Sequence, residues 1–165
     1  MDKEEVILLF LRYPITIFSV SIDKVKYCSH YSAAKSPYNL CLTYILERFV
    51  YDYMRLEKTA ILVLEARGKR EDKEVLEHIK GLLDRDGASH SNSVLKQSIV
   101  GAYFNGKWGR SHNSLKTYFG LEVAGLCSYP IHKFVKTGKE DKAFECIKTK
   151  IYGFPQYYGQ GLKIL

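Results

Sequence analysis

Residues 59–64 read TAILVL, a continuous apolar run that lies between two stretches with helical periodicity. A run without a polar face is typical of a strand that is buried on both faces of an α/β sheet. Glu65 ends the run, and the charged segment 66–72 follows it. The sequence therefore predicts a buried strand that places a carboxylate at its carboxyl end.

Helical patterns lie on both sides of this strand. Before it, apolar residues recur over residues 42–56 at the spacing of a long amphipathic helix. After it, residues 75–83 repeat that spacing, with Asp72 as the expected N-cap and Gly87 as the expected terminator. The strand is therefore expected between two helices.

Weaker patterns predict the remaining elements. They are a helix over 3–11, strands over 15–22 and 94–104, a Gly-rich loop over 105–113, helices over 118–134 (kinked or interrupted at Pro130) and 143–151, and a tail over 153–165 that forms an irregular strand or loop. Alternating strands and helices favour an α/β layer with a largely buried sheet. With 165 residues and no linker-like stretch, we expect one domain over 1–165.

Composition and short motifs indicate which class of partner the protein binds and in which cellular compartment it is found. The net charge of +7 favours acidic partners, with nucleic acid ahead of anionic membranes and acidic proteins. The apolar run 6–11 is far shorter than the ~20 residues that span a bilayer, so no membrane segment is expected. The four cysteines lack zinc-site spacing, which predicts mostly buried, reduced thiols in a cytoplasmic protein. No P-loop, GxGxxG or Ser-His-Asp elbow supports nucleotide hydrolysis or acyl transfer.

Three acids are candidates for a catalytic centre. Glu65 stands where open α/β sheets place their ligands, and Asp72 and Asp23 are its candidate partners. Paired carboxylates there, Glu65 and Asp72 foremost, would hold Mg²⁺ or Mn²⁺ and activate water for phosphodiester cleavage. The structural alternative is a solvated strand end for Glu65, a helix cap for Asp72 and a turn residue for Asp23.

Two basic segments are candidates for nucleic-acid contact. Arg67, Lys69 and Arg70 follow Glu65 directly, and cations beside a carboxylate suit phosphate positioning. The second segment combines an aromatic residue that can stack on a base with cations that can bind phosphate. Its residues are Lys107, Trp108 and Arg110. The alternatives are a charged surface loop for the first segment and plain packing for Trp108.

Four blocks, 18–24, 37–49, 64–72 and 120–131, occur in an order that resembles the domain of unknown function 3800 family. This ribonuclease H-like group occurs in prokaryotes, phages and mobile elements. The resemblance implies a mixed sheet flanked by helices and a metal-dependent nuclease centre.

The chain departs from the family pattern at the expected metal ligands. It lacks the Asp-Glu-Ser-Gly motif of the family's first strand, Gly125 replaces the aspartate of Ala-Asp-Leu, and Glu122 replaces the usual glutamine. Losing two acids of about three removes charge and geometry that a two-metal site needs. We therefore expect a degenerate centre and no cofactor, with Mg²⁺ or Mn²⁺ only if activity survives.

The missing first strand also predicts an exposed sheet edge, and exposed edges recruit partners. We expect strand rearrangement, a homodimer, or a polypeptide that supplies the strand.

Three functions remain open. The first is a degenerate ribonuclease H-like domain that binds nucleic acid or a protein partner, as a remnant, regulator or inhibitor of a mobile element. The second is an active Mg²⁺- or Mn²⁺-dependent nuclease completed by dimerisation. The third is a protein-interaction module whose basic face binds an acidic protein.

Overall fold

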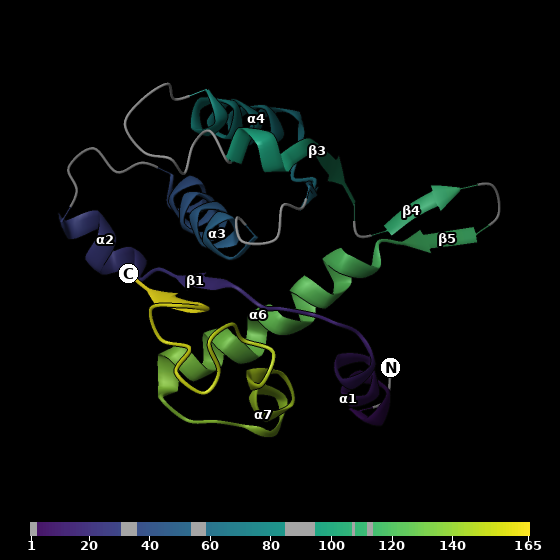
Figure 1. Cartoon of the computed structure of the whole chain (residues 1–165), viewed down its shortest axis with the longest axis vertical. Coiled ribbons are helices and arrows are strands. Elements are labelled where there is room, and N and C mark those ends of the chain that lie inside the picture. The colour runs from purple at the N-terminus through teal and green to yellow at the C-terminus, as the bar shows by residue number, and fades with distance from the viewer. Residues whose placement is uncertain (1–2, 31–35, 54–58, 85–94, 107, 112–113) are drawn as a thin grey trace. The chain divides into compact units, whose positions relative to one another are not determined.

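The computed structural model describes residues 3–30, 36–53, 59–84, 95–106, 108–111 and 114–165. Helices accompany small parallel sheets, so the chain is a mixed α/β protein, as predicted. Its contacts divide it into two compact units, shown with their elements in Figure 1. Unit 1 comprises residues 1–37 and 126–165, and unit 2 comprises residues 38–125.

Unit 2 is built on a β-α-β arrangement. Parallel strands β2 (Ala60–Glu65) and β3 (Ile99–Asn105) are joined through helix α4 (Lys69–Leu83), because parallel neighbours need a crossover connection. Helix α3 (Pro37–Tyr53) precedes β2. These elements confirm the helix–strand–helix pattern predicted around residues 59–64.

Helical periodicity explains the core of unit 2. Residues one helical turn apart share a face, so α3 and α4 each present an apolar stripe to β2 and β3. The buried residues are Leu42, Leu46, Val50, Leu64, Val75, Ile79, Leu82, Leu95 and Ile99. A hydrogen bond of 2.8 Å between Thr43 Oγ1 and His78 Nε2 also joins α3 to α4.

The burial of β2 differs from the prediction. Leu64 is buried, but Ile61 and Val63 are 57% and 47% exposed. On β3, Tyr103 is paired in register with Val63 and is also exposed. The expected burial on both faces is therefore wrong: one face of the strand pair packs on the core and the other is open. An unbroken apolar run contains no period that would distinguish these two cases.

Several predicted boundaries also shift. The strand expected from residue 94 begins at Ile99, because residues 95–98 are helical. The loop expected over 105–113 contains strand β4 (Trp108–Ser111), which pairs antiparallel with β5 (Ser114–Thr117). The helix expected to start at Asp72 starts at Lys69, with Gly68 as its N-cap, so Asp72 as N-cap is wrong. The terminator Gly87 lies outside the described residues.

Unit 1 contains a second pair of parallel strands, β1 (Ser19–Ser21) and β6 (Leu162–Ile164). The predicted strand over 15–22 is thus shorter, with one further bridge from Ile17 to Ile151. Its helices are α1 (Lys3–Arg12), α2 (Lys24–His30), α7 (Lys142–Lys148) and the second half of α6 (Phe119–Thr137), which includes Pro130.

Aromatic packing forms the core of unit 1. The rings of Phe134 and Phe144 stack with centroids 4.0 Å apart, and Tyr157 meets both edge-on. Phe10 and Leu162 are also fully buried. Each unit therefore has a core of its own.

The described cysteines are free thiols, and Cys127 is the buried one among Cys41, Cys127 and Cys146. Burial raises the pKa of the Cys127 thiol to about 11. The expectation of mostly buried thiols therefore holds for one of these three. Within the described ranges, no helix has the length and apolarity that crossing a membrane requires.

Candidate functional site

The carboxyl ends of β2 and β3 meet at one edge of unit 2. Glu65 pairs in register with Asn105, and the Ala66 N–H donates a 2.9 Å hydrogen bond to the Asn105 carbonyl. Because parallel strands end at the same edge, the segments that follow them leave the sheet side by side. We call the carboxyl ends of β2 and β3, with the segments that follow them, the carboxyl edge. The two basic segments singled out in the sequence both start at this edge.

A hydrogen bond to Asp72 holds the first basic segment, which follows β2, in place. Its Oδ1 accepts a 2.9 Å hydrogen bond from the Arg67 N–H. The side chain therefore reaches back from the first turn of α4 to the residue before the N-cap. Gly68 makes this turn possible, because its φ of +133° lies where side chains other than glycine are strained. Asp72 thus has a structural role at the carboxyl edge.

Tyr38, at the start of α3, belongs to the same edge. The guanidinium carbon of Arg67 lies 4.9 Å from the centre of the Tyr38 ring, a cation–π contact. The pKa of the Tyr38 hydroxyl is raised, chiefly by burial; Arg67 opposes this, and the charges of Asp72 and Glu65 add to it. The structure therefore brings Glu65, Arg67 and Asp72 together around Tyr38.

No sequence pattern singles out Tyr38 as a candidate site residue. Residue 38 lies in one of the four blocks that carry the family resemblance, but no local pattern links it to residue 67. Only the packing of α3 beside the loop after β2 brings the ring and the guanidinium together.

Lys69 and Arg70 lie exposed in the first turn of α4. Arg70 Nε forms a 3.2 Å ion pair with Glu74 Oε1, and the two side chains are 87% and 58% exposed. Pairs this exposed contribute little to stability because water screens them. Arg70 is therefore accessible to an anionic ligand at small energetic cost.

The second basic segment begins where β3 ends. Trp108 pairs in register with Thr117, and Arg110 pairs with Leu115, so a regular hairpin replaces the expected loop. Residues 105–118 include Lys107, Arg110 and Lys116 and no acid. Lys107 lies outside the described residues. The sequence of this segment is therefore basic.

Asp23 belongs to unit 1 and caps a helix there. Its Oδ1 accepts hydrogen bonds from the N–H groups of Val25 (3.0 Å) and Lys26 (3.3 Å) at the start of α2. The structural alternative predicted for Asp23 is a turn residue, and the structure shows a helix cap instead. Of the three candidate acids, unit 2 holds Glu65 and Asp72.

A metal centre would need more ligands than these two acids. Mg²⁺ takes near-octahedral oxygen ligands and is often held by one or two carboxylates together with substrate phosphates. In the portion of the chain that the structure describes, no three His, Cys, Asp or Glu side chains gather closely enough to hold a metal ion. Glu65 and Asp72 alone fit at most a weak, phosphate-assisted site.

Comparison of the chain with protein-family models, curated proteins and solved structures found no match.

Proposed function

We propose that this chain binds nucleic acid at the carboxyl edge of unit 2 and that its fold is a catalytically degenerate ribonuclease H-like arrangement. The observation that carries the proposal is the Ala66–Asn105 hydrogen bond, which brings two basic segments to the same edge. The family resemblance of the four blocks supports the fold part of the proposal.

Three properties of the edge suit a nucleic acid. The hairpin supplies cations without acids, and the net charge of +7 attracts polyanions at long range. Trp108 is an aromatic residue of the type on which bases stack. Arg67 has its guanidinium held on the Tyr38 ring, and a positioned guanidinium binds phosphate through a fixed fork of donors. Glu65 and Asp72 make the edge less basic, which favours a modest affinity.

Binding is tested by fluorescence anisotropy with labelled single- and double-stranded DNA and RNA between about 50 and 200 mM salt. We expect log K to fall linearly with log salt. Each of Arg67→Gln and Arg110→Gln removes one phosphate contact and is therefore expected to make this slope less steep by about 1. The matched control is Lys80→Gln, an equal charge change in the last turn of α4. Absence of binding at about 50 mM salt, or equal effects of all three variants, contradicts the proposal.

Glu65 separates binding from catalysis. For a binding protein, Glu65→Gln removes an anion from the edge, so affinity is expected to rise. For a nuclease, the same change removes a metal ligand and lowers Mn²⁺-dependent cleavage. Incubating both proteins with each nucleic acid and Mn²⁺ distinguishes the two, and cleavage lost in Glu65→Gln overturns the degenerate assignment.

A protein partner is the second candidate, favoured by the open face of β2 and β3. Ile61, Val63 and Tyr103 on this face are each close to half exposed or more, and exposed apolar patches mark interaction sites. Light scattering after size-exclusion chromatography tests for a homodimer. A dimer that Val63→Lys dissociates supports this candidate, and a monomer at high concentration argues against a homodimer.

A further inference from the structure

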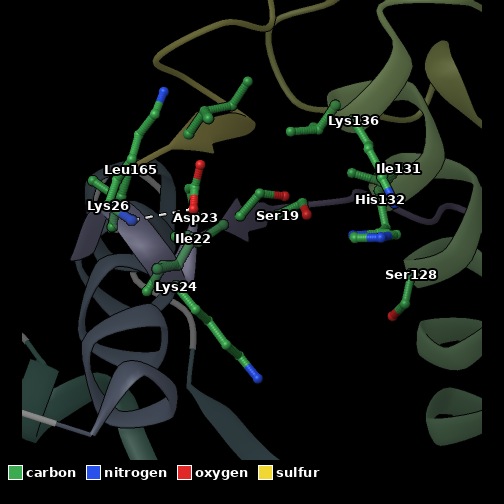
Figure 2. Close-up of a pocket in the computed structure, with 14 residues that line it drawn as sticks. Ser19, Ile22, Asp23, Lys24, Lys26, Ser128, Ile131, His132, Lys136 and Leu165 are labelled. Carbon is green, nitrogen blue, oxygen red and sulfur yellow. Dashed lines mark hydrogen bonds between the residues drawn. The ribbon is translucent and has the colours of Figure 1, made fainter. Parts of the chain in front are cut away.

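A pocket of about 1010 Å³ lies in unit 1, and its lining includes no residue of the carboxyl edge. The end of β1 and the start of α2 form one side, and the second half of α6 forms the other (Figure 2). Its lining residues all belong to unit 1. The volume is at the upper end of the ~300–1,000 Å³ typical of small-molecule sites.

Positive charge dominates the polar lining. Lys24 and Lys26 come from α2, and Lys136 comes from α6. Lys24 extends toward the open space between the two sides, and His132 faces it from α6 (Figure 2). Lys24 and Lys136 therefore bring positive charge to both sides of the pocket, which favours an anionic ligand.

Asp23 is the acidic side chain in the lining. Its Oδ1 already accepts the N–H groups of Val25 and Lys26 as the cap of α2. The lining side chains therefore include three lysines and one aspartate, which gives them a net positive charge. Ser19 and Ser128 also line the pocket, one on each side.

The rest of the lining is apolar. Ile22, Val135 and Ile164 contribute aliphatic surface, and Ile164 is 49% exposed. A bare inorganic anion would leave this surface in water. A pocket with few convergent polar groups on an apolar wall suits a ligand that is both charged and apolar.

We infer that this pocket binds a small organic phosphate whose remaining part is largely apolar or aromatic. Lysine ammonium groups bind phosphate as point charges, and the three lysines of the lining offer several donors to the oxygens of a phosphoryl group. The site shares no residue with the carboxyl edge and does not depend on nucleic-acid binding there.

Isothermal titration calorimetry with three probes tests the inference. Adenosine monophosphate is expected to bind more tightly than either inorganic phosphate or adenosine, because it alone meets both the lysines and the apolar wall. If adenosine binds as tightly as adenosine monophosphate, the phosphate contributes nothing to binding. If inorganic phosphate binds as tightly, the apolar wall contributes nothing. Either result, or no binding of adenosine monophosphate at about 5 mM, overturns the inference.

Lys136→Gln and Lys139→Gln form a matched pair near the end of α6. Lys136 lines the pocket, and Lys139 is exposed just beyond the helix and does not line it. Loss of a charged hydrogen bond is expected to weaken binding of adenosine monophosphate about tenfold in Lys136→Gln and not in Lys139→Gln. Equal effects contradict the assignment. Thermal unfolding of both variants checks that each is folded.

A 5′-phosphorylated hexanucleotide distinguishes a free ligand from the end of a nucleic acid. Amide shifts of Ser128 and His132 report binding at this pocket by NMR. We expect them to move with the mononucleotide in the wild type and in Arg110→Gln alike. Movement with the hexanucleotide alone would overturn the small-ligand inference and leave the proposal for the carboxyl edge standing.

Discussion

At the scale of single residues, the Asp141 carboxylate both caps a helix and forms an ion pair. Its Oδ1 accepts the Phe144 N–H at 2.9 Å, which caps α7. Its Oδ2 lies 2.9 Å from Lys133 Nζ, on α6. The hydrogen bond from Lys133, with help from Phe144, lowers the pKa of Asp141 from its ordinary 3.8. The ionised form therefore stabilises the folded state.

A pH dependence follows from this shift. A carboxyl group with a lowered pKa in the folded state contributes stability above its unfolded pKa and loses it as pH falls through the folded value. We expect Asp141→Asn to lower the free energy of unfolding at pH 7 and the difference from the wild type to shrink below about pH 4. Urea unfolding of both proteins at pH 7 and below about pH 4 measures the two differences in free energy of unfolding. Equal differences at the two pH values would contradict the prediction.

At the scale of elements, glycine has opposite roles in α4 and in the tail. Gly81 lies near the end of α4, and an added Cβ would meet nothing within 4 Å. At Gly161, an added Cβ would collide with the backbone oxygen and nitrogen of Tyr152. The Gly161 N–H also donates to that same Tyr152 carbonyl, so the two backbones are held close together.

The two glycines make a matched test. Gly81→Ala is expected to stabilise the protein by about 0.5–1 kcal/mol, because alanine loses less backbone entropy in a helix. Gly161→Ala is expected to destabilise it, because backbone must move to admit the methyl group. Chemical denaturation of both variants measures the changes, and a tolerated Gly161→Ala would argue against the close approach to Tyr152.

Strand β2 allows a second comparison within one element. Leu64→Ala removes a buried side chain and is expected to lower the free energy of unfolding by about 2–5 kcal/mol. Ile61→Thr changes a side chain that is 57% exposed and keeps the β-branched shape, so its effect is expected to stay below about 1 kcal/mol. A large effect of Ile61→Thr would mean that this face is covered.

At the scale of the whole molecule, the chain holds two cores in two compact units. Ile79 lies in the core of unit 2, and Phe144 lies in that of unit 1. We expect Ile79→Ala to lower stability by about 2–5 kcal/mol and to reduce amide-exchange protection most in unit 2. Equal loss of protection in both units would show that they unfold as one.

Much of the fold is predictable from the sequence alone. The periodic apolar residues of α3 and α4 and the unbroken apolar run of β2 identify those elements. This works because helix and strand periods depend on neighbours along the chain. The candidate acids and cations are also recognisable by type and position, since they follow directly on strand ends. The function that the family resemblance implies stays a prediction.

The tertiary structure decides what those residues do. Whether β2 is covered on one face or two depends on what packs against it. Residues 59–64 are all suited to a buried strand, so their sequence does not indicate which face is covered. The sequence suggests an acid that caps α4, but in the structure Asp72 accepts a hydrogen bond from the Arg67 N–H, and Gly68 between them has a φ of +133°. Residues 66 and 105 lie far apart in sequence and meet only because β2 and β3 pair in parallel. Local patterns determine elements over a few residues, whereas a site depends on strand pairing over many, which no short window of sequence contains.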